Sequence, residues 1–381
     1  MTAALGATAT GVVEATLSGL IETTLSGLVQ GTSGGLVKAT SSGLVQVTST
    51  GPLQITPAAL LEILIEGLGT AGVYVMIASG LSLIFGLMGV LNFAHGALTT
   101  VGGYVGGAFL VLVGGAVLAD AATGSLGVFG LWIVAIVLTG LFLALLGAII
   151  EVGLVRQLYD RPPIYQILLT FGVALVIQQV LRIVVGLYED PDRHWTAAET
   201  AGPWIVQQGN EIEVLGLAIQ GIRLMEIALG ALVVVGVWAF LTRTRYGLYI
   251  RAGSEDAEMA QALGIDVRQV FTVVFGIGIG LAGMAGTFLI WEKTYDLTVL
   301  MGAQALLPAF IVVVVGGLGT FKGTVVASVV AGIFTEAGVF LSTNYESLPT
   351  QLPSMLIFLL LVAVLIVKPQ GLFGQAEVGG H

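Results

Sequence analysis

The sequence predicts an all-α integral membrane protein, a polytopic bundle of eight or nine transmembrane helices. Of its 381 residues, 56% are apolar and only 9% are charged, whereas an average globular chain has about 25% charged residues. The mean hydropathy of +1.01 agrees with this composition. Apolar runs of about 20 residues recur along the chain, and a helix of that length crosses the hydrocarbon layer of a bilayer. A soluble core of this size could not bury so many runs.

Residues 1–56 differ in composition from the rest of the chain. A motif of the type Ser-Gly-Leu-Val recurs there every eight residues, with copies beginning at Ser18, Ser26, Gly34, Ser42 and Thr50. Known solenoid repeats have longer periods, and Gly, Ser and Thr weaken a helix in every copy. We expect this low-complexity extension to be mostly disordered, with an irregular β-rich or surface-lying segment as the alternative. It precedes a transmembrane domain at 57–374 and a short C-terminal tail at 375–381.

From Thr56 onward the chain consists of apolar runs separated by short polar breaks. We expect spans at 63–90, 97–118, 128–150, 164–186, 224–241, 269–290, 303–317, 322–342 and 351–367. The run at 303–317 is short and contains Pro308, so a half-span or a re-entrant element is the alternative to a full crossing. Eight and nine crossings therefore both stay open.

The basic residues indicate the orientation, because loops on the cytoplasmic side carry an excess of Lys and Arg. If the 243–268 loop is cytoplasmic, eight basic residues lie inside: Arg156, Arg161, Arg243, Arg245, Arg251, Arg268, Lys322 and Lys368. Only Arg193, Arg223 and Lys293 then lie outside. This excess favours a cytoplasmic C-terminus and places the acid-rich 187–223 loop outside. With nine spans the N-terminal extension is also external.

Several function classes are disfavoured by composition and motifs. The chain has no Cys, and its net charge of −10 argues against nucleic-acid binding. No P-loop occurs, the three His show no metal-ligand spacing, and no catalytic constellation is visible. The GxGxxG pattern at 278–283 lies in an apolar span, so we interpret it, like the GxxxG pairs, as close helix packing. We therefore expect no enzyme activity, no metal and no cofactor of the chain's own.

Two polar features lie inside or between the spans. The break Asn92-Phe93-Ala94-His95-Gly96 is either a structural turn or a functional element, since Asn and His at membrane depth need polar partners or water. Glu336 lies near the middle of its span, where a lipid-facing carboxylate costs about 2–3 kcal/mol. We expect Glu336 to face the interior, bound to Asn92 or His95 or exposed to a substrate pathway. Arg182 and Glu226 are nearer span ends and are expected to snorkel.

The 251–268 loop predicts a short cytoplasmic helix over 255–263. Ser254 is a suitable N-cap, Glu255, Asp256 and Glu258 fall in the first turn, and Gly264 suits the C′ position. Met259, Ala260 and Leu263 form a small apolar face. The helix is either a solvated connector or a docking element for a soluble partner.

Several blocks of the sequence resemble the permease subunits of branched-chain amino acid ABC importers. The matching blocks are Leu81-Ser82-Leu83-Ile84-Phe85-Gly86 with Leu91-Asn92-Phe93-Ala94-His95-Gly96, Arg251-Ala252 through Ala262-Leu263-Gly264-Ile265, Val315-Gly316-Gly317-Leu318-Gly319-Thr320 with Gly323, and Lys368-Pro369-Gln370-Gly371-Leu372-Phe373-Gly374. The resemblance runs from about Leu60 to Gly374. The block at 92–96 favours the LivH type over its sister subunit.

The resemblance implies a multi-pass plasma-membrane permease that works with a second homologous permease, two cytoplasmic ATP-binding subunits and an extracytoplasmic substrate-binding protein. It also implies that the 255–264 segment is the helix that couples to the ATPase, which alone uses ATP. The tentative substrate pathway contains Asn92, His95 and Glu336. Two alternatives to branched-chain or similar hydrophobic amino acids stay open: an ABC permease for urea or short-chain amides, and an ion-coupled carrier that uses Glu336.

Overall fold

The structure is a computed structural model that describes residues 36–39, 45–48, 56–114, 126–188, 190, 195–207, 209–292, 295, 297–345 and 347–374. Most of the N-terminal extension and the whole tail at 375–381 lie outside the described residues. Within the extension, strands β1 (Leu36–Ala39) and β2 (Val45–Thr48) pair antiparallel, with Leu36 opposite Thr48.

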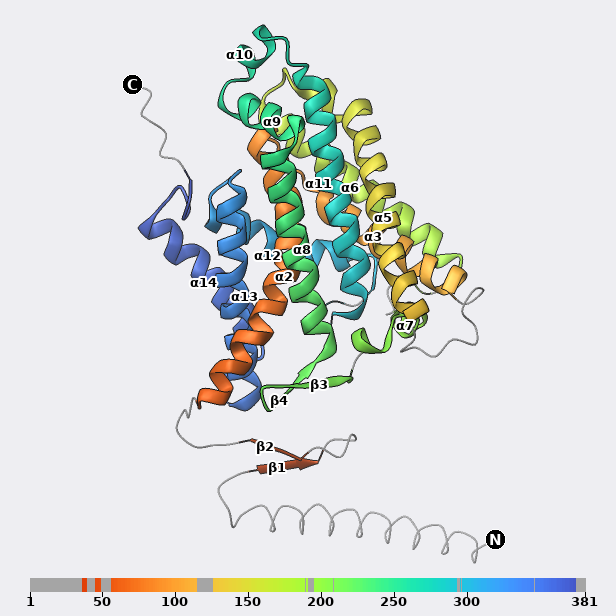
Figure 1. The fold of residues 1–381 in the computed structure, drawn as a ribbon, viewed down its shortest axis with the longest axis vertical. Helices are drawn as coiled ribbons and strands as arrows, with labels where there is room; N and C mark the ends of the chain where they lie inside the picture. The colour runs from red at the N-terminus through yellow and green to blue at the C-terminus, as the bar shows by residue number, and fades with distance from the viewer. Residues whose placement is uncertain are drawn as a thin grey trace, which may run out of the picture.

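The rest of the described chain is almost entirely helical (Figure 1). The long helices are α2 (Pro57–Met88), α5 (Leu126–Gly153), α6 (Pro163–Gly186), α8 (Gly221–Arg243), α11 (Val267–Phe288) and α13 (Phe321–Asn344). The shorter ones in the bundle are α3 (Ala94–Phe109), α12 (Met301–Gly316) and α14 (Leu352–Val367), and single turns η1 (Leu110–Gly114), η2 (Val155–Leu158) and η4 (Leu289–Trp291) extend α3, α5 and α11. Helices α7 (Thr196–Thr200), α9 (Arg245–Glu255) and α10 (Ala257–Ala262), turn η3 (Trp204–Val206) and strands β3 (Glu211–Val214) and β4 (Leu217–Gln220) lie at the ends.

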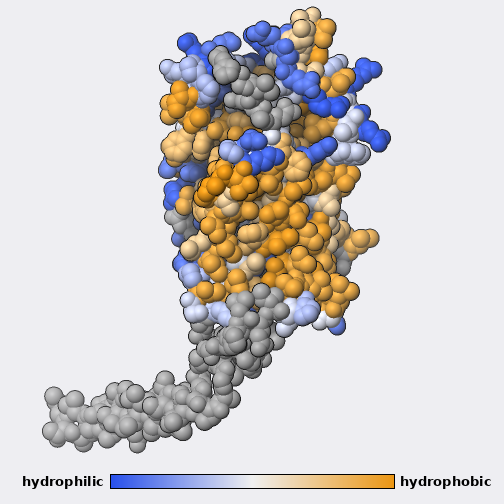
Figure 2. Space-filling view, turned by 90° about the vertical axis from the view of Figure 1, so that its left-hand side faces the viewer, coloured by the Kyte–Doolittle hydropathy of each residue, from blue (hydrophilic) through white to orange (hydrophobic). Residues whose placement is uncertain are grey.

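The spans correspond closely to those expected from hydropathy. Within the described residues, seven helical stretches are long and apolar enough to cross a membrane, and α12 and α14 are shorter apolar helices. Each of the nine expected spans matches one of these elements to within about two helical turns. The all-α polytopic bundle is thus confirmed. Apolar side chains cover the middle of the face in Figure 2, while hydrophilic side chains gather at the end that carries α10.

Helix α2 is the centre of the bundle. It packs against α8, α11, α12 and α13, and every residue from 69 to 84 is buried. Such an all-round apolar helix has no face suited to solvent. Glycines bring the neighbouring backbones close, since a Cβ at Gly72 would lie 2.2 Å from the carbonyl oxygen of Glu226. A Cβ at Gly80 would likewise lie 2.3 Å from that of Gly278.

The GxGxxG pattern lies on α11 and serves helix packing, as predicted. Gly278 faces α2, and an added Cβ at Gly280 would lie 2.9 Å from the carbonyl oxygen of Gly140 on α5. Gly283 contacts the side chain of Leu143, also on α5. Small residues thus let α11 approach α2 and α5 at once, as in other closely packed membrane helices.

Helices α3 and α12 both begin inside the bundle. The His95 ring at the start of α3 bonds to the carbonyl of Ile77, which precedes Met88, the end of α2, by eleven residues, about 16 Å along its axis. A Cβ at Gly302, in the first turn of α12, would lie 1.8 Å from the carbonyl oxygen of Gly96. The amide of Gly302 also donates to Thr100 Oγ1 at 2.9 Å. The first turns of α3 and α12 therefore meet inside the bundle. Because α12 begins there, it crosses only part of the bundle.

The two ends of the bundle carry different structures (Figure 1). One end has α9 and α10, together with residues 368–374, whose backbone bonds to the end of α12 through Leu372 and Phe373. The opposite end has α7 and the β3–β4 hairpin, in which Glu211 pairs with Gln220. Its two-residue turn, Leu215–Gly216, has positive φ at both positions, as hairpin turns of type I′ require.

Candidate functional site

Three groups of residues inside or at the end of the bundle could carry function: the α10 helix, the break at 92–96, and a buried cluster around Arg223. The sequence singled out the first two and one member of the third. They lie on different elements of the bundle.

Helix α10 starts two residues later than predicted. Asp256 is its N-cap, because its Oδ1 accepts the amide of Met259 at 2.8 Å. The predicted N-cap, Ser254, was wrong: α9 continues to Glu255, and the Ser254 hydroxyl donates back to the carbonyl of Arg251 at 2.9 Å. Glu255 therefore belongs to α9, and Glu258 is the acidic residue in the first turn of α10.

The three residues of the predicted apolar face of α10 differ in their exposure to solvent. Met259 and Leu263 are 57% and 75% exposed, whereas Ala260 is buried. Gly264 ends the helix with a φ of +85°, and the amide of Ile265 donates to the carbonyl of Ala260 at 3.1 Å, which is a Schellman-type end. The result is an exposed apolar pair on a short helix at the tip of the molecule.

A buried carboxylate fixes the helices beneath this end. Glu151, at the end of α5, is fully buried and accepts two hydrogen bonds from Arg156, at 3.1 and 3.0 Å. Thr272 of α11 donates to it at 2.7 Å, and the phenol of Tyr159 donates to it as well. Burial of the ring, together with this hydrogen bond, raises the pKa of Tyr159, so the phenol stays a donor.

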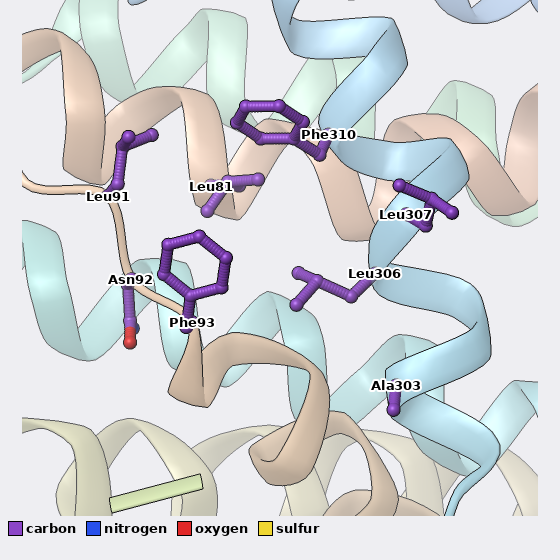
Figure 3. Close-up of a pocket in the computed structure, with 8 residues that line it drawn as sticks. All are labelled: Leu81, Leu91, Asn92, Phe93, Ala303, Leu306, Leu307 and Phe310. Carbon is purple, nitrogen blue, oxygen red and sulfur yellow. The ribbon is translucent and has the colours of Figure 1, made fainter. Parts of the chain in front are cut away.

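The break at 92–96 is a largely buried turn in which some polar side-chain atoms have no hydrogen-bond partner among the described residues. His95 Nε2 donates to the carbonyl of Ile77 at 3.0 Å, and Asn92 Oδ1 accepts the amide of Ala94 at 3.0 Å. Among the described residues, neither His95 Nδ1 nor Asn92 Nδ2 has a partner. A largely apolar cavity of about 120 Å³ lies between this break and α12, with Asn92 and Phe93 on one side and Leu306 and Phe310 on the other (Figure 3).

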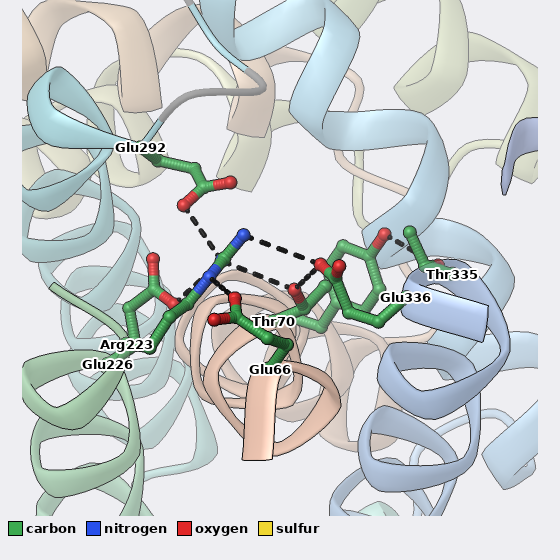
Figure 4. Close-up of polar contacts among 8 residues, drawn as sticks. Glu66, Thr70, Arg223, Glu226, Glu292, Thr335 and Glu336 are labelled. Carbon is green, nitrogen blue, oxygen red and sulfur yellow. Dashed lines mark hydrogen bonds and ion pairs between the residues drawn. The ribbon is translucent and has the colours of Figure 1, made fainter. Parts of the chain in front are cut away.

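The third group is a cluster of four carboxylates around one guanidinium (Figure 4). Arg223, in the first turn of α8, forms ion pairs with Glu66 Oε2 at 2.6 Å, Glu226 Oε2 at 2.9 Å, Glu292 Oε2 at 3.0 Å and Glu336 Oε1 at 3.5 Å. Thr70 of α2 donates to Glu336 and accepts from Arg223 Nη1 at 3.4 Å. The cluster thus joins α2, α8, α13 and the segment after α11.

The Arg223 cluster lies within the bundle and away from bulk water. The side chain of Glu226 is fully buried, and those of Arg223, Glu292 and Glu336 are at most 9% exposed. Glu66 is the member nearest the surface, at 21%. Ion pairs held this deeply are costly to desolvate, so each charge depends on its partners.

A polar cavity of about 270 Å³ adjoins the cluster, between α2, α12, α13 and α14. Glu292 and Glu336 line it, as do the hydroxyl-bearing residues Thr70, Tyr74, Tyr295, Thr335, Thr350 and Ser354. The Tyr74 hydroxyl lies 3.2 Å from Thr335 Oγ1. This cavity, rather than the apolar one at the break, is where the bundle offers charged groups to a small molecule.

The structure separates the residues of the predicted pathway. Glu336 does face the interior, but its partners are Thr70 and Arg223 rather than Asn92 or His95. Glu226 does not snorkel, because its side chain is buried against Arg223. Arg223 itself lies in a buried helical turn, not in an external loop. The spacing of Arg223 and Glu226, three residues apart on one helix, was the available signal for this cluster.

Together, the fold and the site define a polytopic helical membrane protein with a polar, charged interior. Residues 63–365 match the family described as the branched-chain amino acid transport system / permease component, and the chain belongs to this family. It is 27% identical over 320 residues to the high-affinity branched-chain amino acid transport system permease protein LivH of Escherichia coli K12, a match that covers 84% of this chain and 96% of that protein.

Two further relatives come from other organisms. The permease protein BraD of Pseudomonas aeruginosa is 26% identical, over 84% of this chain and 97% of the relative. A probable LivH of Methanocaldococcus jannaschii is 25% identical, over 79% of this chain and 88% of the relative. No solved structure matches the chain.

Proposed function

We propose that the chain is the LivH-type permease subunit of an ABC importer and passes branched-chain or similar hydrophobic amino acids across the plasma membrane. Family membership supports the transport role, and the names of the relatives support the substrate class. In this proposal a second homologous permease completes the pathway, an extracytoplasmic binding protein delivers the substrate, and two cytoplasmic ATP-binding subunits supply the energy. The chain itself then needs no cofactor and catalyses no reaction.

The observation that carries the proposal is the exposed apolar pair of α10. Met259 and Leu263 project from the end of the bundle where the basic residues gather, on a helix capped at both ends. The excess of Lys and Arg favours the cytoplasm for this end, and with it the C-terminus. An apolar pair held rigidly in the cytoplasm suits docking to a soluble ATPase, since its burial there removes apolar surface from water.

The test changes the docking face without touching the bundle. The double variant Met259→Asp/Leu263→Asp should insert normally but lose ATPase binding and ATP-driven uptake of leucine. Glu258→Gln is the matched control, because it removes a charge from the same helix while leaving the apolar pair. Retention of the ATPase by the double-Asp variant at the wild-type yield would reject the docking role of α10.

The same preparation distinguishes an ATP-driven permease from an ion-coupled carrier. Uptake should stop when the partner ATPase is inactivated and should continue when a proton uncoupler is added. Uptake that follows the opposite pattern would reject the proposed function and favour a carrier.

A further inference from the structure

The cavity beside Arg223 has the properties of a site for a small organic cation. We propose that this 270 Å³ cavity, between α2, α12, α13 and α14, binds the ammonium group of the transported amino acid during its passage. The inference rests on the proposed function and adds to it the chemical group that the permease itself recognises.

Polar and apolar groups lie on different sides of the cavity. The carboxylates of Glu292 and Glu336 lie on the side of Arg223, where Figure 4 shows both directed toward the guanidinium. Apolar side chains complete the lining, from Val73, Pro308, Val339 and Ile357. The volume approaches the lower end of small-molecule pockets, about 300 Å³, which suits a molecule of amino-acid size. One side of the cavity thus fits a cation and the other an aliphatic group.

The same cavity also contains a tyrosine hydroxyl. Tyr295 is only 7% exposed and lines the cavity, and no hydrogen bond of its hydroxyl is found within the described part of the chain. The hydroxyl is therefore open to the cavity and available as a donor or acceptor to a molecule bound there.

The charge balance of the cluster also favours a cation. Among the described residues of the cluster, Arg223 is the single cation, and it faces the carboxylates of Glu66, Glu226, Glu292 and Glu336. One Oε1 of the buried Glu226 has no partner within that part of the chain. The described cluster thus has more carboxylate oxygens than guanidinium donors. A ligand cation can donate to the carboxylate oxygens that line the cavity.

The same balance decides which end of an amino acid enters. Arg223 already uses Nε, Nη1 and Nη2 in ion pairs, so the guanidinium is not free to bind a substrate carboxylate. The carboxylates of Glu292 and Glu336, which line the cavity, would repel a substrate carboxylate. The ammonium can instead lie between Glu292 and Glu336, where each carboxylate accepts a charge-assisted hydrogen bond. Arg223 competes with the ammonium for the carboxylate oxygens of Glu292 and Glu336. This competition weakens substrate binding and so favours release of the substrate inward.

The test measures equilibrium binding of radiolabelled leucine to the complete transporter in lipid nanodiscs. Two competitors separate the functional groups: leucinol keeps the ammonium without a carboxylate, and 4-methylpentanoate keeps the carboxylate without an ammonium. We expect leucinol to displace leucine. We expect 4-methylpentanoate to fail to displace it even at about tenfold the effective concentration of leucinol. Equal displacement by both competitors, or displacement by 4-methylpentanoate alone, would overturn the proposal.

Variants then assign the binding to this cavity. Glu336→Gln should weaken leucine binding about tenfold, which is the loss of one charge-assisted hydrogen bond. Tyr295→Phe should weaken it about threefold, since that hydrogen bond involves no charge on the protein. Glu62→Gln is the matched control, because Glu62 is exposed and one turn from Glu66 on the same helix. Wild-type affinity in both cavity variants would overturn the assignment.

The outcomes also separate this inference from the proposed function. If the transporter takes up leucine but the two competitors act alike, the ammonium site is wrong and the function stands. If no leucine is taken up, yet radiolabelled leucinol binds in a Glu336-dependent manner, the function is wrong and the site stands. Should Glu336→Gln fail to assemble, the competition on the wild type and the Tyr295→Phe variant still decide the question.

Discussion

Replacement of Arg223 tests whether one guanidinium holds the interior of the bundle together. Arg223→Met keeps a long, unbranched side chain but removes the cation that faces four carboxylates at 2.6 to 3.5 Å. Removing one partner of a buried ion pair costs about 3–5 kcal/mol, because the remaining charge is left uncompensated. We therefore expect the free energy of unfolding to fall by at least about 3 kcal/mol. The free energy of unfolding of Arg223→Lys should lie between those of the wild type and Arg223→Met, since an ammonium keeps the charge but cannot reproduce the fork of guanidinium donors.

The assay is thermal unfolding of the purified membrane protein, followed by tryptophan fluorescence and by the monodisperse fraction after heating. Arg161→Met is the control, because Arg161 is exposed and such surface changes usually stay within about 0.5 kcal/mol. Adding Glu226→Gln to Arg223→Met should restore part of the loss, because it removes the most deeply buried of the stranded carboxylates. A single variant as stable as Arg161→Met would refute the reasoning.

Three further variants test other parts of the structure. Gly302→Leu should block correct folding, because a Cβ alone would lie 1.8 Å from the carbonyl oxygen of Gly96; a wild-type yield of monodisperse protein would contradict this close contact. Glu151→Gln should lower the free energy of unfolding by about 1–3 kcal/mol, since Arg156 loses its carboxylate partner; unchanged thermal unfolding would show that this contact contributes little. Deletion of residues 1–56 should leave uptake intact, because Gly-rich, weakly apolar repeats cannot bury enough surface to offset the entropy of ordering; a variant that inserts normally but transports nothing would disprove it.

The fold was predictable because hydropathy along the chain directly reports which segments prefer lipid to water. The same reasoning identified the short α12 and the small-residue packing of α11, which depend on local sequence. The same reasoning failed for contacts between side chains of helices that are distant in the sequence. Glu336 was expected beside Asn92 or His95, but its neighbours are Thr70 and Arg223, which are distant in the sequence. Periodicity shows that a carboxylate is inside and does not show which helix faces it.

The capping of α10 failed for a different reason. Ser254 is a good N-cap by residue type, but Asp256 is equally good, and residue type alone does not choose between them. The choice was made by α9, whose continuation to Glu255 puts Ser254 inside a helix. The start of a helix therefore depends on where the preceding helix ends as well as on the residue type at the boundary.

Helix α2 connects two regions whose roles are proposed separately. It is 32 residues long, which corresponds to about 48 Å. Glu66, about 10 Å from the midpoint of the helix, bonds to Arg223, and Leu87, about 22 Å from the midpoint on the other side, lies against Gly253 of α9, where an added Cβ would be 3.2 Å from the Leu87 side chain. A rigid rod tilts as one body: a tilt of about 5° around the midpoint displaces Leu87 by about 2 Å and Glu66 by about 0.9 Å, in opposite directions. A push on α9 would therefore move Glu66 against Arg223 by more than the range of hydrogen-bond lengths, about 0.5 Å, without any residue in between changing its conformation.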